Sequence, residues 1–315
     1  MRDIKFQQES HTSRLHLSGD IDVKHGILGA GGVGGVIGSI LGDAGEEVIL
    51  IVRPGTANHF PPELSLNSKY GNITARATVV EALHEPLDVL WITVKATQLD
   101  SALREIPDDT KVSTVVPLLN GVDHVQVLRD RFGHDEVVPA TIAGEMERTA
   151  PGKYVHPSPF LRMNLAASGR ERLAHPVEQF KRFGIECNFI DNEQTLLWSK
   201  MVFLAPFALS STAADKPVGG VLSDPSRKKL LEDCIAEACE AARANGAEVH
   251  SELPMKLLSS SPPEMRSSMQ KDVAAGRAPE LDAIAGPILR SAEAHGFHAN
   301  ATQRLVAEIK RRLKT

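Results

Sequence analysis

Three glycines near the start of the chain have the spacing of a dinucleotide-binding turn. Gly29, Gly31 and Gly34 follow the apolar run 25–28, and a helix-like pattern continues over 36–41. In a G-x-G-x-x-G motif the first glycine permits the turn and the second lets the backbone approach a pyrophosphate, while the third allows close packing of helix on strand. Free N–H groups at the helix start then face the phosphates. With these flanks the pattern favours cofactor binding over a merely structural turn. The candidate cofactor contacts are Gly29, Ala30, Gly31, Gly32, Val33 and Gly34.

The residue after the second predicted strand indicates which dinucleotide is bound. Residues 47–52 read as a strand, and Arg53 stands where an NAD site has Asp or Glu. A guanidinium can clamp a 2′-phosphate and cannot accept a hydrogen bond from a ribose hydroxyl. The sequence therefore predicts NADP(H). The alternative is an arginine that is simply exposed at a strand end.

Two further polar residues close apolar runs. Lys95 follows the run 87–94 and Asn120 follows 112–119. Ligands of open α/β sheets collect beyond the carboxyl ends of the strands, so both belong to the candidate crevice. Lys95 could bind a phosphate or carboxylate or be merely solvated, and Asn120, before Gly121, could be a turn residue or a ligand contact.

The second half of the chain contributes a lysine and a glutamate. Lys200 lies inside an otherwise apolar predicted helix, and a desolvated lysine has a lowered pKa and can donate a proton near neutral pH. Glu280 follows Pro279 at a predicted helix start, where the helix dipole favours a carboxylate. From spacing alone a structural role is favoured for Glu280.

The order of predicted elements gives the fold class. Strand patterns at 72–79, 87–94, 112–119, 137–142, 154–156, 161–166 and 187–190 alternate with helical patterns, including one that begins near residue 98. From residue 192 onward only helical patterns remain, at 195–213, 227–245, 279–295 and 302–313. We expect an α/β protein, an N-terminal Rossmann-type doubly wound sheet with a C-terminal all-α domain. The expected divisions are an extension at 1–22, an NADP-binding domain at 23–190 and a helical substrate and catalytic domain at 191–315.

Composition limits the partners and the compartment. The 315 residues carry a net charge of −5, which argues against nucleic-acid binding, and no run approaches the 18 apolar residues of a membrane span. The three cysteines have no metal-ligand spacing, so no metal is expected, and their odd number suits a reducing cytoplasm. Residues 1–22 lack the apolar core of a signal peptide. A short added strand and a disordered or cloning-derived extension stay open for that segment.

Taken in order, these residues make the chain similar to a known family. It resembles ketopantoate reductase (2-dehydropantoate 2-reductase) from about residue 23 to the C-terminus. Beyond the glycine turn, the matching residues are Val52-Arg53, Thr93-Val94-Lys95, Leu119-Asn120-Gly121, Gly152-Lys153-Tyr154-Val155-His156, Trp198-Ser199-Lys200, Ser267-Ser268-Met269 with Asp272, and Glu280-Leu281-Asp282 before Gly286.

The resemblance implies an NADPH-dependent reductase of a small 2-keto acid, by default the 2-dehydropantoate of pantothenate biosynthesis. It implies that Lys200 is the general acid and that Glu280 contacts the substrate hydroxyl and holds the lysine. Ser268 matches a contact to the substrate carboxylate, and Asn120 matches a residue near both nicotinamide and substrate. Arg53 and Lys95 match cofactor contacts, and a homodimer through the helical domain is compatible with the family.

One departure from the family pattern concerns the substrate. The family helix usually carries Asn four and eight residues after the lysine, whereas this chain has Leu204 and Ala208, with Pro206 between them. A site without those amides loses discrimination for a substrate hydroxyl. The alternatives are therefore a reductase for a more apolar 2-keto acid and a non-catalytic NADPH-binding member of the family.

Overall fold

A five-stranded parallel sheet forms the centre of the N-terminal part of the molecule. The computed structural model describes residues 23–314. The strand order is β5-β2-β1-β6-β7, and every pair is parallel. The strands are β1 (Lys24–Leu28), β2 (Glu47–Ile51), β5 (Thr78–Val80), β6 (Leu87–Ile92) and β7 (Val112–Pro117). This is the doubly wound order with its switch point between β1 and β6, as the fold-class prediction requires.

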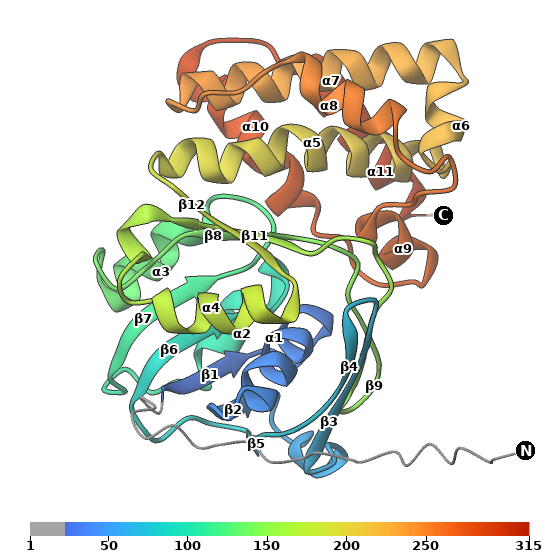
Figure 1. Ribbon diagram of the computed structural model, residues 1–315. Helices are drawn as coiled ribbons and strands as arrows, with labels where there is room; N and C mark the ends of the chain where they lie inside the picture. The colour runs from blue at the N-terminus through green and yellow to red at the C-terminus, as the bar shows by residue number, and fades with distance from the viewer. Residues whose placement is uncertain (1–22, 315) are drawn as a thin grey trace, which may run out of the picture.

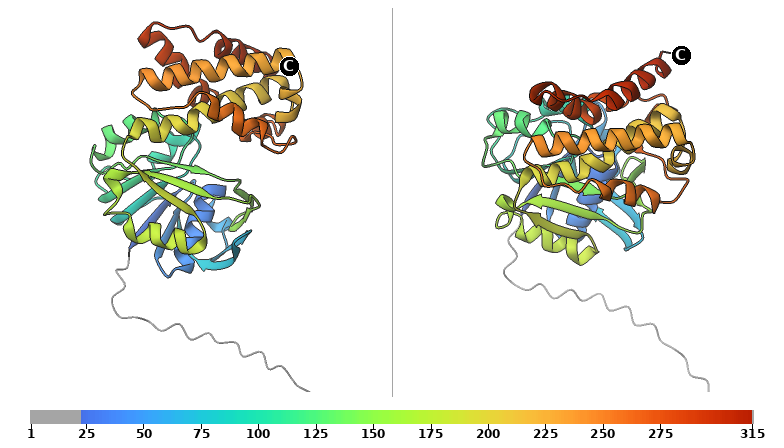
Figure 2. Two further views of the ribbon diagram at one scale, coloured as in Figure 1. Left: turned by 45° about the horizontal axis from the view of Figure 1, so that its top comes forward. Right: turned by 90° about the horizontal axis from the view of Figure 1, so that it is seen from above.

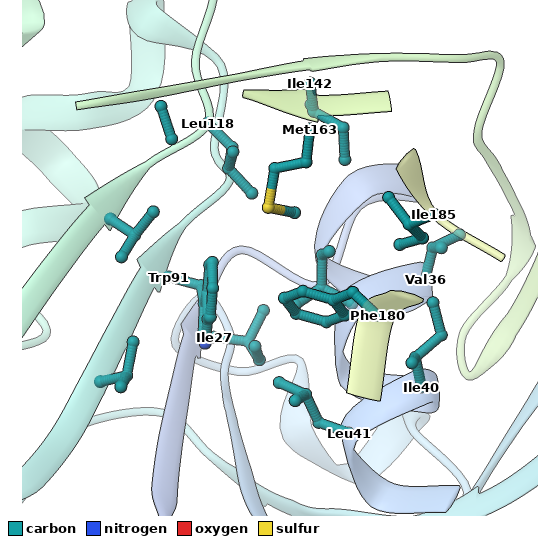
Figure 3. Close-up of a cluster of buried hydrophobic side chains, with 14 of the residues drawn as sticks. Ile27, Val36, Ile40, Leu41, Trp91, Leu118, Ile142, Met163, Phe180 and Ile185 are labelled. Atoms are coloured by element: carbon teal, nitrogen blue, oxygen red, sulfur yellow. The ribbon is translucent and has the colours of Figure 1, made fainter. Parts of the chain in front are cut away.

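Successive residues of the central strands point to opposite faces, and both faces are covered. Ile27 packs beneath α1 (Gly32–Asp43) and α4 (Ala174–Phe183), together with Trp91 and Phe180, as Figure 3 shows. Its neighbour Leu28 lies in the cluster on the other face, beneath α2 (Leu99–Leu103) and α3 (His124–Phe132). The helix expected from residue 98 is thus a short one, preceded by the 3-10 turn Ala96–Gln98.

Two smaller sheets flank the central one. One has the order β4-β3-β10-β9 and the other β12-β11-β8. Their strands are β3 (Glu63–Ser68), β4 (Gly71–Arg76), β9 (Glu147–Ala150), β10 (Lys153–His156), β8 (Ala140–Ala143), β11 (Arg162–Ala166) and β12 (Glu186–Ile190). The prediction of one strand over 72–79 is wrong, because the chain leaves β4 after Arg76 and re-enters the central sheet as β5.

The C-terminal part is entirely helical in the described residues and stacks on one end of the sheet region (Figures 1 and 2). Its helices are α5 (Glu193–Ala214), α6 (Val218–Leu222), α7 (Pro225–Ala244), α8 (Glu252–Ser259), α9 (Ser268–Ala274), α10 (Leu281–His295) and α11 (Asn300–Arg312). They bury a separate apolar cluster that runs from Trp198 to Ile309.

Helix α5 is the element that joins the two parts. It begins where the Asn192 side chain accepts a hydrogen bond from the Thr195 N–H at 2.8 Å, and it continues through Pro206 without a break. It contacts the strands β8 and β11 on one side and the helices α7, α9, α10 and α11 on the other. By length and composition α5 could cross a membrane, but most of it is buried inside the protein, as in the core helix of a folded domain.

Candidate active site

The three motif glycines meet three different steric demands. Gly29 has φ +101°, and a Cβ there would lie 2.6 Å from Val94 Cγ1. A Cβ on Gly34 would lie 2.2 Å from the Gly29 carbonyl oxygen, which already accepts a hydrogen bond from Thr93 Oγ1 at 2.6 Å. A Cβ on Gly31 would meet nothing within 4 Å. The first and third glycines are therefore needed by the fold, whereas the second keeps open the space into which a pyrophosphate would fit.

The start of α1 suits an anion. Gly31 caps the helix without any side-chain hydrogen bond, and no acidic residue occupies the first turn. The first N–H groups of a helix lack partners within the helix, and the macrodipole favours negative charge beside them. The residues of this turn thus fit the diphosphate of a dinucleotide.

A chain of hydrogen bonds joins the helical part to the carboxyl edge of the sheet. Lys200 Nζ, on α5, donates to Asn120 Oδ1 at 2.9 Å. Asn120 Nδ2 donates to Glu280 Oε2 at 3.3 Å, and the Ala96 N–H donates to Glu280 Oε1 at 2.8 Å. A lysine only donates and a carboxylate only accepts, so the charges at its two ends fix the orientation of the Asn120 amide.

Local backbone geometry brings these groups together. Asn120 follows β7, and Gly121 then turns the chain with φ +93°; a Cβ there would lie 2.8 Å from the Ala283 carbonyl oxygen on α10. Glu280 precedes α10 but does not cap it with its side chain. Its carboxylate reaches instead across to the loop after β6, which also borders the glycine turn. The helix-start interpretation of Glu280 is therefore incomplete, because the carboxylate binds residues of the other half of the chain.

Burial sets the electrostatics around Lys200. Loss of hydration lowers the pKa of the partly buried Lys200 ammonium to about 8, and the negative charge of Glu280 opposes that decrease. His124, at the start of α3, is 5% exposed, and burial together with the Lys200 charge lowers its pKa to about 4. At neutral pH the site thus has a protonated lysine whose proton is readily donated, beside a neutral imidazole.

Lys95 and Asp272 form a second connection between the two parts. Lys95 Nζ lies 2.5 Å from Asp272 Oδ2 on α9, and Arg277 Nε lies 2.8 Å from Asp272 Oδ1. Asp272 is not among the residues predicted from the sequence to form the site. In the sequence Asp272 is marked only by its place after Ser267-Ser268-Met269, in a segment that resembles the family. Its pairing with Lys95 has no local pattern, because the two residues lie 177 positions apart.

Arg53 and Ser268 lie outside the Lys200–Asn120–Glu280 chain. Arg53 is exposed just after β2, and its guanidinium makes no hydrogen bond or ion pair with any residue in 23–314. Ser268 is the exposed first residue of α9. Both roles, a cofactor contact and a substrate contact, stay predictions.

Leu204 and Ala208 follow Lys200 by one and two turns of α5. Residues four apart share a helix face, so both continue the face that carries Lys200. Leu204 is partly buried and Ala208 is 1% exposed.

Comparison with known proteins identifies the family. The model described as ketopantoate reductase PanE/ApbA matches residues 25–168, and the model of the C-terminal part of that family matches 192–313. The chain belongs to the ketopantoate reductase family. It is accordingly an oxidoreductase, and its fold is that of the family, a parallel sheet followed by a helical region.

Three known proteins show what this chain is similar to. The 2-dehydropantoate 2-reductase of Caulobacter vibrioides is 28% identical over 291 residues, which are 89% of this chain and 96% of that protein. The crystal structure of a PanE/ApbA family ketopantoate reductase from Ralstonia eutropha JMP134 has a TM-score of 0.78 at 25% identity, with coverage of 91% and 97%. The ternary structure of D-mandelate dehydrogenase with NADH and anilino(oxo)acetate has a TM-score of 0.80 at 20% identity, with coverage of 92% and 98%. A protein of the same fold thus binds NADH together with anilino(oxo)acetate.

Proposed function

We propose that this protein reduces a 2-keto acid to the 2-hydroxy acid with NADPH, and that Lys200 is the general acid. The observation that carries the proposal is the Lys200–Asn120–Glu280 hydrogen-bond chain, which ends on the loop beside the glycine turn. On this proposal residues 23–190 are the NADP-binding domain, residues 191–315 are the substrate and catalytic domain, and the reaction occurs between them.

The proposed roles follow from charge and geometry. The nicotinamide, when bound, supplies the hydride for the keto carbon. Lys200 holds its positive charge where negative charge develops on the keto oxygen, stabilises that oxyanion and then donates its proton. Asn120 accepts from Lys200 and so fixes its nitrogen, while Glu280 holds Asn120 and offsets part of the cost of desolvating the ammonium. Ser268 is proposed as the contact to the substrate carboxylate.

NADPH is proposed over NADH because of Arg53. Its guanidinium is exposed at the end of β2 and has no protein partner in the described part of the chain, so it is available to a 2′-phosphate. Lys95 is proposed as a second cofactor contact, which would exchange Asp272 for a cofactor phosphate. The default substrate, 2-dehydropantoate, is that of the named relative from Caulobacter. A cytoplasmic location and a homodimer complete the proposal.

The test is the loss of NADPH absorbance with 2-dehydropantoate and a panel of other 2-keto acids, paired with a direct NADPH titration. The proposal predicts tight NADPH binding and turnover of at least one 2-keto acid. Binding of NADPH without turnover of any 2-keto acid would overturn the proposed reaction and favour a protein that only binds the cofactor.

A further inference from the structure

Each polar member of the Lys200–Asn120–Glu280 chain is accompanied by a partly buried apolar residue. Val122 follows Asn120 by two residues, Leu204 follows Lys200 by one helical turn, and Leu281 follows Glu280 directly. All three pack against the apolar cluster of the helical part, and Val122 also packs against the cluster between the central sheet and the helices α2 and α3. Of these three, Leu204 also shares the helix face of Lys200.

The Lys200 face of α5 offers no polar group for three turns. The residues at the following positions on this face are Phe203, Leu204, Phe207 and Ala208, and the next polar one is Ser211. Ser211 is fully buried, and its hydroxyl already shares a 2.9 Å hydrogen bond with the hydroxyl of Ser267. A hydroxyl on the substrate side chain would thus lose water beside α5 and find no partner on that helix.

That loss has a known size and sign. A buried hydroxyl without a partner costs about a factor of ten or more in binding, whereas a methyl group at the same place gains from burial. An apolar wall rejects an added hydroxyl by about a hundredfold at most, so the expected preference is moderate.

We propose that the 2-keto acid reduced by this protein has a hydrocarbon side chain without a hydroxyl, and that Leu204 is a residue that selects it. The inference rests on the proposed reduction of a 2-keto acid, and it replaces the default substrate, 2-dehydropantoate, by 2-keto acids that lack the hydroxyl. Leu204 is chosen because it is partly exposed and lies one turn beyond Lys200, whereas Ala208 is enclosed. Phe203 is also partly exposed, but it lines a pocket against α8.

A matched pair of substrates isolates the effect. 2-Dehydropantoate and 3,3-dimethyl-2-oxobutanoate have the same carbon skeleton and differ only by one hydroxyl. With NADPH saturating, we expect kcat/KM of the unmodified protein to be at least about tenfold higher for 3,3-dimethyl-2-oxobutanoate. Leu204→Asn, which supplies an amide at this wall, should shift the ratio by about tenfold or more toward 2-dehydropantoate.

Two control variants separate selection from damage to the fold. Leu204→Met keeps the wall apolar and should retain the original preference. Leu253→Asn makes the same chemical change on α8, where the leucine is 49% exposed, and should leave the ratio unchanged. Thermal melts of all three variants identify any that fail to fold. If Leu204→Asn fails to fold, the preference of the unmodified protein between the two substrates carries the test.

The outcomes distinguish the two claims. Turnover of both substrates with 2-dehydropantoate preferred would overturn this inference and leave the proposed reductase intact. Turnover of neither, nor of any other 2-keto acid, would overturn the proposed function itself. A preference for 3,3-dimethyl-2-oxobutanoate that Leu204→Asn reverses or narrows supports both.

Discussion

Replacing Glu280 by glutamine removes one negative charge from the Lys200–Asn120–Glu280 chain while keeping the size of the side chain. The charge of Glu280 raises the pKa of Lys200 against the desolvation that lowers it to about 8. Without that charge desolvation acts unopposed. The pKa of Lys200 should therefore fall below its present value in Glu280→Gln.

The size of the decrease follows from the separation of the two groups. Glu280 reaches Lys200 through Asn120, by hydrogen bonds of 3.3 and 2.9 Å in series. At an effective dielectric constant of about 20, two unit charges across such a gap interact by about 2 kcal/mol. Since about 1.4 kcal/mol corresponds to one pH unit, the pKa of Lys200 should fall by roughly one to two units.

The assay is the pH dependence of kcat/KM for NADPH-dependent reduction of whichever 2-keto acid is turned over. A general acid must be protonated, so activity should decline above about pH 8 in the unmodified protein. In Glu280→Gln the same decline should begin roughly one to two units lower. Asp282→Asn removes a neighbouring but exposed carboxylate, whose partner is Arg290, and should leave the midpoint in place. An identical midpoint in Glu280→Gln and the unmodified protein would refute the electrostatic coupling.

Three further predictions concern the cofactor and acid stability. Arg53→Asp should weaken NADPH relative to NADH by about tenfold or more, measured as the ratio of the two KM values; an unchanged ratio removes Arg53 from the site. Gly31→Ala should lower NADPH affinity with little change in Tm, because a Cβ at this position would meet nothing within 4 Å. Gly34→Ala should lower Tm by several degrees, because its Cβ would lie 2.2 Å from the Gly29 carbonyl oxygen. Equal losses of Tm would contradict this difference. His25 and His124 have pKa values lowered to about 4 by burial, so each is neutral in the folded protein and gains protons on unfolding below about pH 6.5. The free energy of unfolding, measured with urea, should therefore be highest above that pH and fall by about 2 kcal/mol per histidine between pH 7 and 5. A free energy of unfolding that does not change over this range would contradict the burial of the two neutral imidazoles.

The central sheet was predictable because its signals are local. The continuous apolar runs that became β6 and β7 mark strands covered on both faces, and the glycine turn locates the end of β1. The two flanking sheets were harder to predict. Strand β3 alternates exposed and buried residues and pairs with β10 over a long sequence separation. Strand β9 pairs with β10 as its neighbour in the chain, but it has only four residues and is largely exposed. Residues 1–22, where a short strand stayed open, lie outside the described part of the chain.

The site could be predicted residue by residue but not as an assembly. The pattern predicted a lysine within an apolar helix, and the structure gives it a lowered pKa and a partly buried side chain. Spacing left Asn120 open as a turn residue or a ligand contact, and it favoured a helix start for Glu280. The hydrogen bond between the two could not be predicted, because it joins residues 160 positions apart. The Lys95–Asp272 pair could not be predicted for the same reason. Long-range pairing of polar side chains depends on tertiary structure, and it leaves no pattern among neighbouring residues of a single sequence.

The most direct test of the account is a comparison of Lys200→Ala with the unmodified protein, by stopped-flow measurement of NADPH oxidation in a single turnover and by equilibrium titration with NADPH. If Lys200 is the general acid, the rate of the chemical step should fall by about a hundredfold to ten-thousandfold in Lys200→Ala. NADPH affinity should stay within about twofold, since the glycine turn and Arg53 are untouched by the change. A Lys200→Ala protein that reduces its 2-keto acid at an undiminished rate would contradict the role of Lys200.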